Sequence, residues 1–125
     1  MGKKKILLVD DEPDLLRIMH FTINSWGYDV ISVSNGKDAI DIVKTQKLDV
    51  IILDYLMPEM DGISALKEIR KIDAEVPVII ITAHIDGIAI KDVKSLKVNA
   101  LIPKMSANYM LKTAIEMTEK KKEDL

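Results

Sequence analysis

Three aspartates, one threonine and one lysine are the residues of this sequence whose types could do chemistry together. They are Asp10, Asp11, Asp54, Thr82 and Lys104, and each lies at or just beyond the end of an apolar run. Clustered carboxylates repel one another unless a cation or a proton lies between them. Oxygen ligands without His or Cys favour a hard ion such as Mg²⁺, which takes one or two carboxylates together with phosphate oxygens. We therefore expect an ionic site for a divalent cation and a phosphoryl group.

Within such a site, Thr82 and Lys104 would hold the phosphoryl oxygens that the cation leaves free. Phosphoryl transfer depends mainly on positioning and charge neutralisation around an in-line displacement, and a carboxylate can act as the nucleophile. The carboxylate of Asp54 is the expected acceptor.

Apolar runs before these residues predict the scaffold that brings them together. Two of the runs are apolar at every position, which is typical of strands covered on both faces of a parallel sheet. Strands that alternate with helices over one domain predict an open α/β fold, in which ligands bind outside the carboxyl ends of the strands. The expected strands are Ile6–Val9, Val30–Val33, Val50–Leu53, Val78–Ile81 and the weaker Leu101–Ile102.

Helical segments fill the intervals between these strands. The first should bury one stripe, leave Leu16 and His20 off that stripe, and let His20 face solvent. The stripe consists of Leu15, Ile18, Met19, Thr22, Ile23 and Trp26. The helices are expected from Pro13 to Trp26, after Asn35-Gly36, from Asp61-Gly62 to before Pro77, from about Ile85 to Lys97, and from about Ala107 to Lys120. The charge-rich tail of residues 119–125 is expected to fray.

Length and composition limit the class of protein. The chain has 125 residues, 48% of them apolar, which suits one domain of ~100–200 residues. Its 18 basic and 20 acidic residues are interspersed, and only Arg17 and Arg70 are arginines, so direct nucleic-acid binding is not expected. The apolar run after Lys3–Lys5 is too short for an export signal or a membrane span. Because the chain also has no cysteine, we expect a cytoplasmic protein.

Four pieces of the sequence fall in the expected order on the expected strands. They are Asp10-Asp11-Glu12, the segment Asp54-Tyr55-Leu56-Met57-Pro58-Glu59-Met60-Asp61-Gly62, the pair Thr82-Ala83, and Lys104. Together they closely resemble the receiver domain of two-component response regulators, the CheY-like family, over about residues 4–117 of a single domain spanning 1–125. The resemblance implies a flavodoxin-like (βα)5 open parallel sheet with strand order 2-1-3-4-5 and helices on both faces.

The resemblance also implies the roles of the acids. Asp54 would accept a phosphoryl group from a phosphohistidine on a sensor histidine kinase or a histidine phosphotransfer protein. Asp11 and Asp54 would bind Mg²⁺ directly, Asp10 would act mostly through a bound water, and the backbone carbonyl of Leu56 would supply another ligand. Such a domain catalyses only its own phosphorylation and dephosphorylation and is not otherwise an enzyme.

The remaining family positions concern the phosphoryl group and its loop. Thr82, Lys104 and the backbone N–H of Ala83 would contact the phosphoryl oxygens, and Pro58 and Gly62 would shape the loop that leads into the third helix. Phosphorylation would then switch binding to a downstream effector protein or output domain. The sequence shows no output domain, which fits either a stand-alone regulator or a receiver cut from a longer protein.

The sequence departs from the family near the fifth strand. Leu101 stands where receivers usually have an aromatic residue, and Met105 stands where a proline usually follows the lysine. Without that proline a cis Lys104–Met105 bond would cost ~2.5–4 kcal/mol, so we expect it to be trans. His84, two residues beyond Thr82, could influence the lifetime of the phosphoryl group.

The individual acids also fit simpler structural roles. Asp10, Asp11 and Glu12 could merely favour the positive end of the first helix, and Asp54 could be a turn residue. Neither role accounts for Lys104 at the end of the fifth strand. A receiver-like scaffold that binds its partner without phosphorylation is the main alternative function. A phosphohydrolase with an aspartyl intermediate would need a second acid at position 56, which is Leu56.

Overall fold

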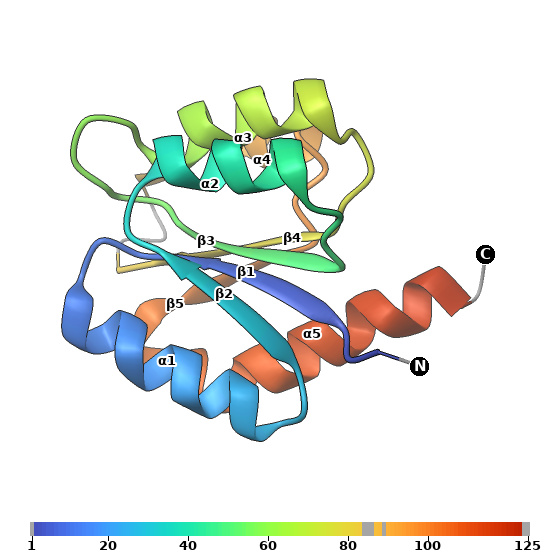
Figure 1. Cartoon of the computed structure of the whole chain (residues 1–125). Helices are drawn as coiled ribbons and strands as arrows, with labels where there is room; N and C mark the ends of the chain where they lie inside the picture. The colour runs from blue at the N-terminus through green and yellow to red at the C-terminus, as the bar shows by residue number, and fades with distance from the viewer. Residues whose placement is uncertain (1, 84–86, 89, 124–125) are drawn as a thin grey trace.

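Five parallel strands form one sheet in the order β2-β1-β3-β4-β5 (Figure 1). The computed structural model describes residues 2–83, 87–88 and 90–123. The expected strand order and the position of the fifth strand at the edge of the sheet are confirmed. The strands are β1 (Lys5–Val9), β2 (Asp29–Val33), β3 (Val50–Asp54), β4 (Val78–Thr82) and β5 (Ala100–Pro103).

Helices cover both faces of this sheet. α1 and α5 lie on one face, and α2, α3 and α4 lie on the other (Figure 1). Their bounds are α1 (Pro13–Ser25), α2 (Gly36–Thr45), α3 (Gly62–Ile72), α4 (Ile90–Ser95) and α5 (Ala107–Glu123), with a 3₁₀ turn at Lys104–Ser106. Among the helices of the described ranges, none is long and apolar enough to cross a membrane.

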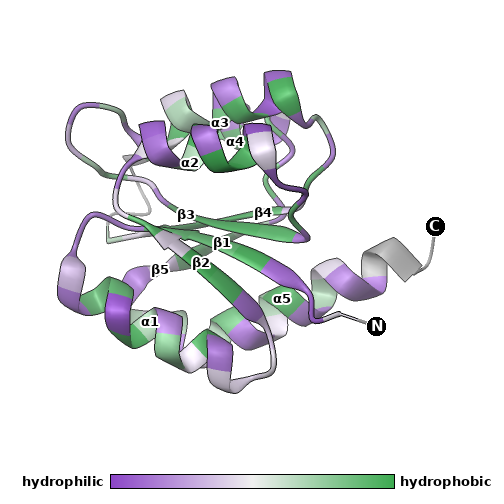
Figure 2. Ribbon diagram, in the orientation of Figure 1, coloured by the Kyte–Doolittle hydropathy of each residue, from purple (hydrophilic) through white to green (hydrophobic). Residues whose placement is uncertain are grey.

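The central strands are buried on both faces, as their unbroken apolar sequences predicted. Alternate residues of β3 enter opposite halves of the core: Ile51 and Leu53 pack towards α2 and α3, whereas Val50 and Ile52 pack towards α1 and α5. Burying one such side chain stabilises the fold by ~1.5–3 kcal/mol. Figure 2 shows this hydrophobic layer between helices whose outer surfaces are mostly hydrophilic. The apolar layer therefore forms a rigid base for the polar strand ends.

The buried stripe of α1 differs from the prediction. Ile18 is 60% exposed, whereas Leu16 packs partly against the core. His20 is half-buried, and its Nδ1 lies within hydrogen-bond distance of the Ser32 hydroxyl on β2. The expectations that Leu16 lies off the stripe and that His20 faces solvent are therefore wrong, because α1 turns this side towards the edge strand β2.

Two helix ends also differ from the prediction. α4 begins at Ile90 and ends at Ser95, two residues before Lys97, which has the left-handed backbone angle φ of 56° that ends a helix. Its expected start at Ile85 lies outside the described residues. α5 continues to Glu123, beyond the expected end at Lys120, so the backbone stays helical into the charged tail.

Candidate functional site

The parallel strands bring the predicted site residues to one edge of the sheet. In the register of the sheet, Val9 pairs with Leu53, Asp54 with Ile81, and Thr82 with Pro103. The next residues after β1 and β5 are Asp10 and Lys104. The carboxyl ends of β1, β3, β4 and β5, which carry the predicted polar side chains, therefore lie side by side. Sequence reasoning placed these residues correctly because the strands are short and apolar up to their last residue.

Three carboxylates cluster at this edge. Asp10, Asp11 and Asp54 each offer an oxygen, and these oxygens lie within 4.8 Å of one another. Asp10 is 0% exposed and Asp54 is 2% exposed. One oxygen of Asp10 accepts a hydrogen bond from the backbone N–H of Glu12 at 2.9 Å, but its buried Oδ2 accepts none from the residues that the structure describes. A buried carboxylate oxygen without a donor is costly unless a cation meets it.

Lys104 supplies the positive charge of the site. Its Nζ donates to Asp54 Oδ2 at 3.0 Å and to Glu12 Oε1 at 2.7 Å, and it lies 3.4 Å from Asp10 Oδ2. The side chain is only 15% exposed. One ammonium therefore faces three carboxylates, two of them buried, and leaves the site with excess negative charge.

Burial controls the protonation of these groups. It raises the pKa of Asp54 from 3.8 to about 6, although the hydrogen bond from Lys104 acts in the opposite direction. Burial likewise raises the pKa of Asp10 above its ordinary value. For Lys104, burial alone would lower the pKa, but hydrogen bonds to Glu12 and Asp54 raise it well above its ordinary value. Lys104 therefore keeps its positive charge, whereas the carboxyl groups of Asp10 and Asp54 lose their protons at a higher pH than exposed aspartates do.

The loop after Asp54 returns to the strand through Gly62. The backbone N–H of Gly62 donates to the carbonyl of Tyr55 at 2.7 Å, and a Cβ on Gly62 would lie only 2.5 Å from the carbonyl oxygen of Asp54. No side chain fits there without moving the backbone. Asp61 begins α3 by accepting a hydrogen bond from the N–H of Ser64 at 2.8 Å. Gly62 therefore shapes the loop, as the resemblance to receiver domains implied.

Further predicted positions border the acid cluster. Thr82 is fully buried at the end of β4, and Ala83 follows it at the exposed edge. The backbone N–H of Leu56 lies 3.4 Å from Asp54 Oδ1. His84, for which an effect on phosphoryl lifetime was expected, lies outside the described residues.

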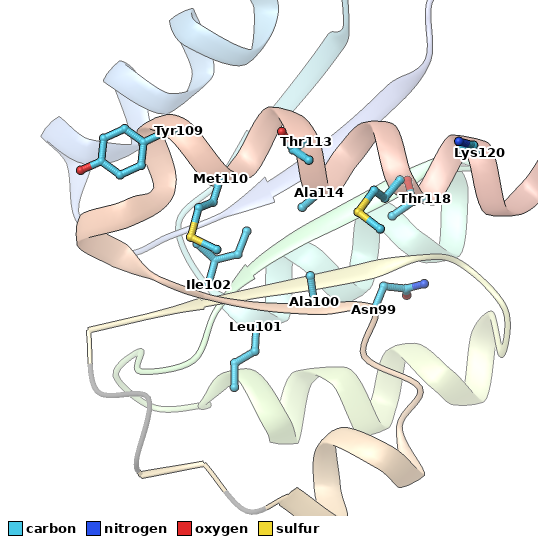
Figure 3. Close-up of a pocket in the computed structure, with 11 residues that line it drawn as sticks. Asn99, Ala100, Leu101, Ile102, Tyr109, Met110, Thr113, Ala114, Thr118 and Lys120 are labelled. Carbon is cyan, nitrogen blue, oxygen red and sulfur yellow. The ribbon is translucent and has the colours of Figure 1, made fainter.

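The two departures near β5 have different surroundings. Leu101 packs into the core on the side of α4, and Figure 3 shows its side chain directed away from α5. Met105 is exposed, and the bond that precedes it is trans, as expected. A groove of about 640 Å³ lies between β5 and α5, with Tyr109 and Met110 in its lining (Figure 3). It lies apart from the acid cluster.

Two contacts at the site were not predicted. Glu12 binds Lys104, and the Tyr55 hydroxyl donates to the carbonyl of Gly87 at 3.2 Å. The third acid of the run Asp10-Asp11-Glu12 was a signal for the first contact. The second joins residues far apart in the sequence, and no local pattern indicates it.

The donor set fits a hard divalent cation. Its side-chain ligands are carboxylate oxygens, the type that Mg²⁺ prefers, and the Asp10 oxygen that lacks a donor is placed among them. Positive charge at this point would also offset the repulsion between the carboxylates. The acid cluster can therefore hold a divalent cation beside the ammonium of Lys104.

Comparison with known proteins agrees with this geometry. Residues 6–116 match the family model described as "Response regulator receiver domain". The alkaline phosphatase synthesis transcriptional regulatory protein PhoP of Bacillus subtilis is 39% identical over 80 residues, which are 64% of this chain and 33% of PhoP. The chain spans about a third, or less, of the length of the curated relatives that it matches.

Two solved structures are similar over nearly the whole chain. A response regulator receiver domain from Clostridium thermocellum is 30% identical, with a TM-score of 0.86, covering 96% of this chain and 97% of that chain. The response regulator protein TrrA from Thermotoga maritima, solved in complex with Mg²⁺-BeF, is 28% identical, with a TM-score of 0.82, covering 92% of this chain and 98% of that chain.

Proposed function

The chain belongs to the family of response-regulator receiver domains, and on that premise we propose that Asp54 is its phosphoryl acceptor and Mg²⁺ its cofactor. The observation that carries the proposal is the buried acid cluster: Lys104 Nζ donates to Asp54 Oδ2 and lies 3.4 Å from Asp10 Oδ2, which accepts no hydrogen bond from the described residues. TrrA, a relative solved with Mg²⁺-BeF, supports the same choice of cation.

In the proposed reaction an oxygen of Asp54 attacks the phosphorus of the donor. A P–O bond to the carboxylate forms, the bond from phosphorus to the donor's leaving group breaks, and the electron pair departs with that group. The donor is a phosphohistidine of a sensor histidine kinase or histidine phosphotransfer protein, or a small acyl phosphate. Because the product is an acyl phosphate on the protein itself, the chain would catalyse its own phosphorylation and dephosphorylation.

The side chains around Asp54 have distinct roles in this step. Asp10, Asp11, Asp54 and the backbone carbonyl of Leu56 would hold Mg²⁺, Asp10 mostly through a water. The ion, when bound, would neutralise charge on the transferred group. The ammonium of Lys104, which binds the carboxylate of Asp54 before phosphorylation, would bind a phosphoryl oxygen afterwards.

Thr82 and Ala83 complete the contacts to the phosphoryl group. The Thr82 hydroxyl and the Ala83 N–H donate to its remaining oxygens. These residues follow β4 directly, so phosphorylation is coupled to the segment between β4 and α4. The consequence is a change in affinity for a downstream effector protein or an output domain. PhoP is named a transcriptional regulatory protein, so an output domain that binds DNA is one such target. Residues 1–125 would form one receiver domain, with its core at about 4–117.

Intact-mass measurement after incubation with acetyl phosphate tests the proposal. We expect one added phosphoryl group that requires Mg²⁺ and is absent in Asp54→Asn. As a matched control, Asp61→Asn keeps a helix-capping side chain outside the acid cluster and should still be labelled. Undiminished labelling of Asp54→Asn would refute the assignment.

A second function, binding a partner without phosphorylation, is favoured by Leu101. This residue packs into the core on the α4 side at the position where the family usually uses an aromatic residue for relay. The two functions differ in one measurement: equal affinity of the phosphorylated and unphosphorylated forms for the same effector would support a scaffold.

A further inference from the structure

Glu12 makes the shortest contact to the ammonium of Lys104. Lys104 Nζ lies 2.7 Å from Glu12 Oε1, compared with 3.0 Å from Asp54 Oδ2 and 3.4 Å from Asp10 Oδ2. Glu12 belongs to the loop after β1 and Lys104 to the turn after β5, so this ion pair closes across the mouth of the site. The pair therefore holds the lysine from the solvent side while Asp54 holds it from within.

Within the described ranges of the chain, Lys104 is the only residue that forms a hydrogen bond with the side chain of Glu12. Glu12 is the N-cap residue of α1, a position where a side chain often binds a backbone N–H of the first turn, yet it makes no capping hydrogen bond. Its backbone N–H donates to Asp10 Oδ1 at 2.9 Å, and its backbone carbonyl accepts from the N–H of Leu16 at 2.9 Å. The side chain is 60% exposed, and it extends towards Lys104 instead of its own helix.

Phosphorylation changes what Lys104 must bind. An ammonium has three N–H donors and carries a single positive charge. Once Asp54 carries a phosphoryl group, the oxygens of that group require the ammonium, and their negative charge lies close to Glu12. The contact with Glu12 must then weaken or break.

We propose that Glu12 is a positioning residue that restrains Lys104 in the unphosphorylated protein and competes with the phosphoryl group for its ammonium. This inference rests on the proposed function at Asp54. It follows that Glu12 slows phosphorylation, because each transfer includes the cost of breaking its ion pair. The effect is modest, about two- to fivefold in rate, since ion pairs with an exposed partner are weak.

Two substitutions separate loss of the contact from loss of charge. Glu12→Asp keeps the charge but shortens the side chain by one methylene, roughly 1.5 Å, so the carboxylate no longer reaches Nζ. Glu12→Gln keeps the reach but removes the charge. The control is Glu59→Gln, which removes the same charge from an exposed glutamate in the loop after Asp54.

The experiment follows labelling by acetyl phosphate at saturating Mg²⁺ with intact-mass detection, and thermal melts confirm that each variant is folded. Glu12→Asp and Glu12→Gln should both be labelled two to five times faster than wild type, while Glu59→Gln should match wild type. If Glu12→Gln and Glu59→Gln are faster and Glu12→Asp is unchanged, charge repulsion of the anionic donor is the cause and the proposal is overturned. Equal rates in all four proteins would also overturn it.

A spectroscopic measurement tests the contact independently of the reaction. In the metal-free protein, the NMR signal of the Lys104 ammonium should move in Glu12→Asp and stay in place in Glu59→Gln. An unmoved signal in Glu12→Asp would show that the contact does not restrain the lysine. Failure of the proposed function looks different, since wild type would then take up no phosphoryl group from acetyl phosphate.

Discussion

Burial of Asp54 should make the metal-free protein less stable as the pH rises. Its pKa is raised from 3.8 to about 6 because the folded protein removes the carboxylate from water. Between these values the folded state binds more protons than the unfolded state, so the free energy of unfolding falls with increasing pH. The stabilising effect is complete below pH 3.8 and is lost as the pH rises through about 6.

The size of this effect follows from the two pKa values. They differ by about 2, and a difference of one in pKa corresponds to ~1.36 kcal/mol, which gives about 3 kcal/mol over the whole titration and about 2.4 kcal/mol between pH 4 and pH 7. Typical domains unfold with ~5–15 kcal/mol, so the loss is large. Replacing Asp54 with the nearly isosteric Asn removes this titration. The variant should therefore gain about 2.4 kcal/mol relative to wild type between pH 4 and pH 7.

Urea denaturation in the presence of a chelator measures the difference. Wild type and Asp54→Asn are compared at pH 4, 5, 6 and 7, so that titrations common to both proteins cancel. Asp41→Asn, on the exposed side of α2, controls for the loss of one carboxylate. A difference between wild type and Asp54→Asn that is independent of pH would refute the argument from burial.

Binding of Mg²⁺ should offset the loss in the free energy of unfolding that wild type shows as the pH rises. A ligand that binds only the folded state adds ~2.7 kcal/mol at a hundredfold excess over its Kd. Because Asp54 must lose its proton to bind the ion, the affinity should fall with decreasing pH below about 6. Coincident melts with and without saturating Mg²⁺ at pH 7.5 would contradict the proposed site.

Four further changes have expected outcomes. Gly62→Ala should destabilise the protein by at least ~1–3 kcal/mol in urea denaturation, because its Cβ would lie 2.5 Å from the Asp54 carbonyl oxygen. Lys104→Ala should spare Mg²⁺ binding, measured by titration calorimetry, but abolish the change in effector affinity on phosphorylation. If the phosphohistidine protein docks on α1, beside the acids that precede this helix, then Ile18→Ala, which removes an exposed apolar side chain of α1, should slow transfer from that protein several-fold and leave labelling by acetyl phosphate unchanged. In structures with and without beryllofluoride, α4 should move while Leu101 keeps its rotamer; the opposite result would place the relay in β5.

The sheet and the acid cluster were predictable because each strand is uniformly apolar and ends in a polar residue. The unbroken apolar sequences of Val50–Leu53 and Val78–Ile81 predict strands that are covered on both faces of the sheet. The burial of every residue in these two strands confirms this prediction. A parallel sheet then leaves little freedom in where Asp54 and Thr82 lie. The site thus follows from local sequence and one rule of topology.

The orientation of α1 could not be predicted in the same way. Leu15, Leu16, Ile18, Met19 and Phe21 place apolar side chains around more than half of the helix, so the helical period does not select one face. The choice depends on packing against β2, where His20 meets Ser32. Contacts of this kind depend on residues distant in sequence, and the same holds for the ion pair between Glu12 and Lys104.

The unfavourable free energy of burying the acid cluster is also the reason why the site responds to ligands. Asp10 and Asp54 are buried beside a single ammonium, and Oδ2 of Asp10 lacks a hydrogen-bond donor within the described part of the chain, so without a metal ion the site keeps negative charge that Lys104 alone does not balance. A ligand that neutralises this charge stabilises the folded state, and it shifts a conformational equilibrium only by its differential affinity for the two states. Tyr55 follows Asp54 directly and its hydroxyl binds the carbonyl of Gly87 on the segment before α4. A change at Asp54 therefore has a short physical route to α4 that does not require an aromatic residue at Leu101.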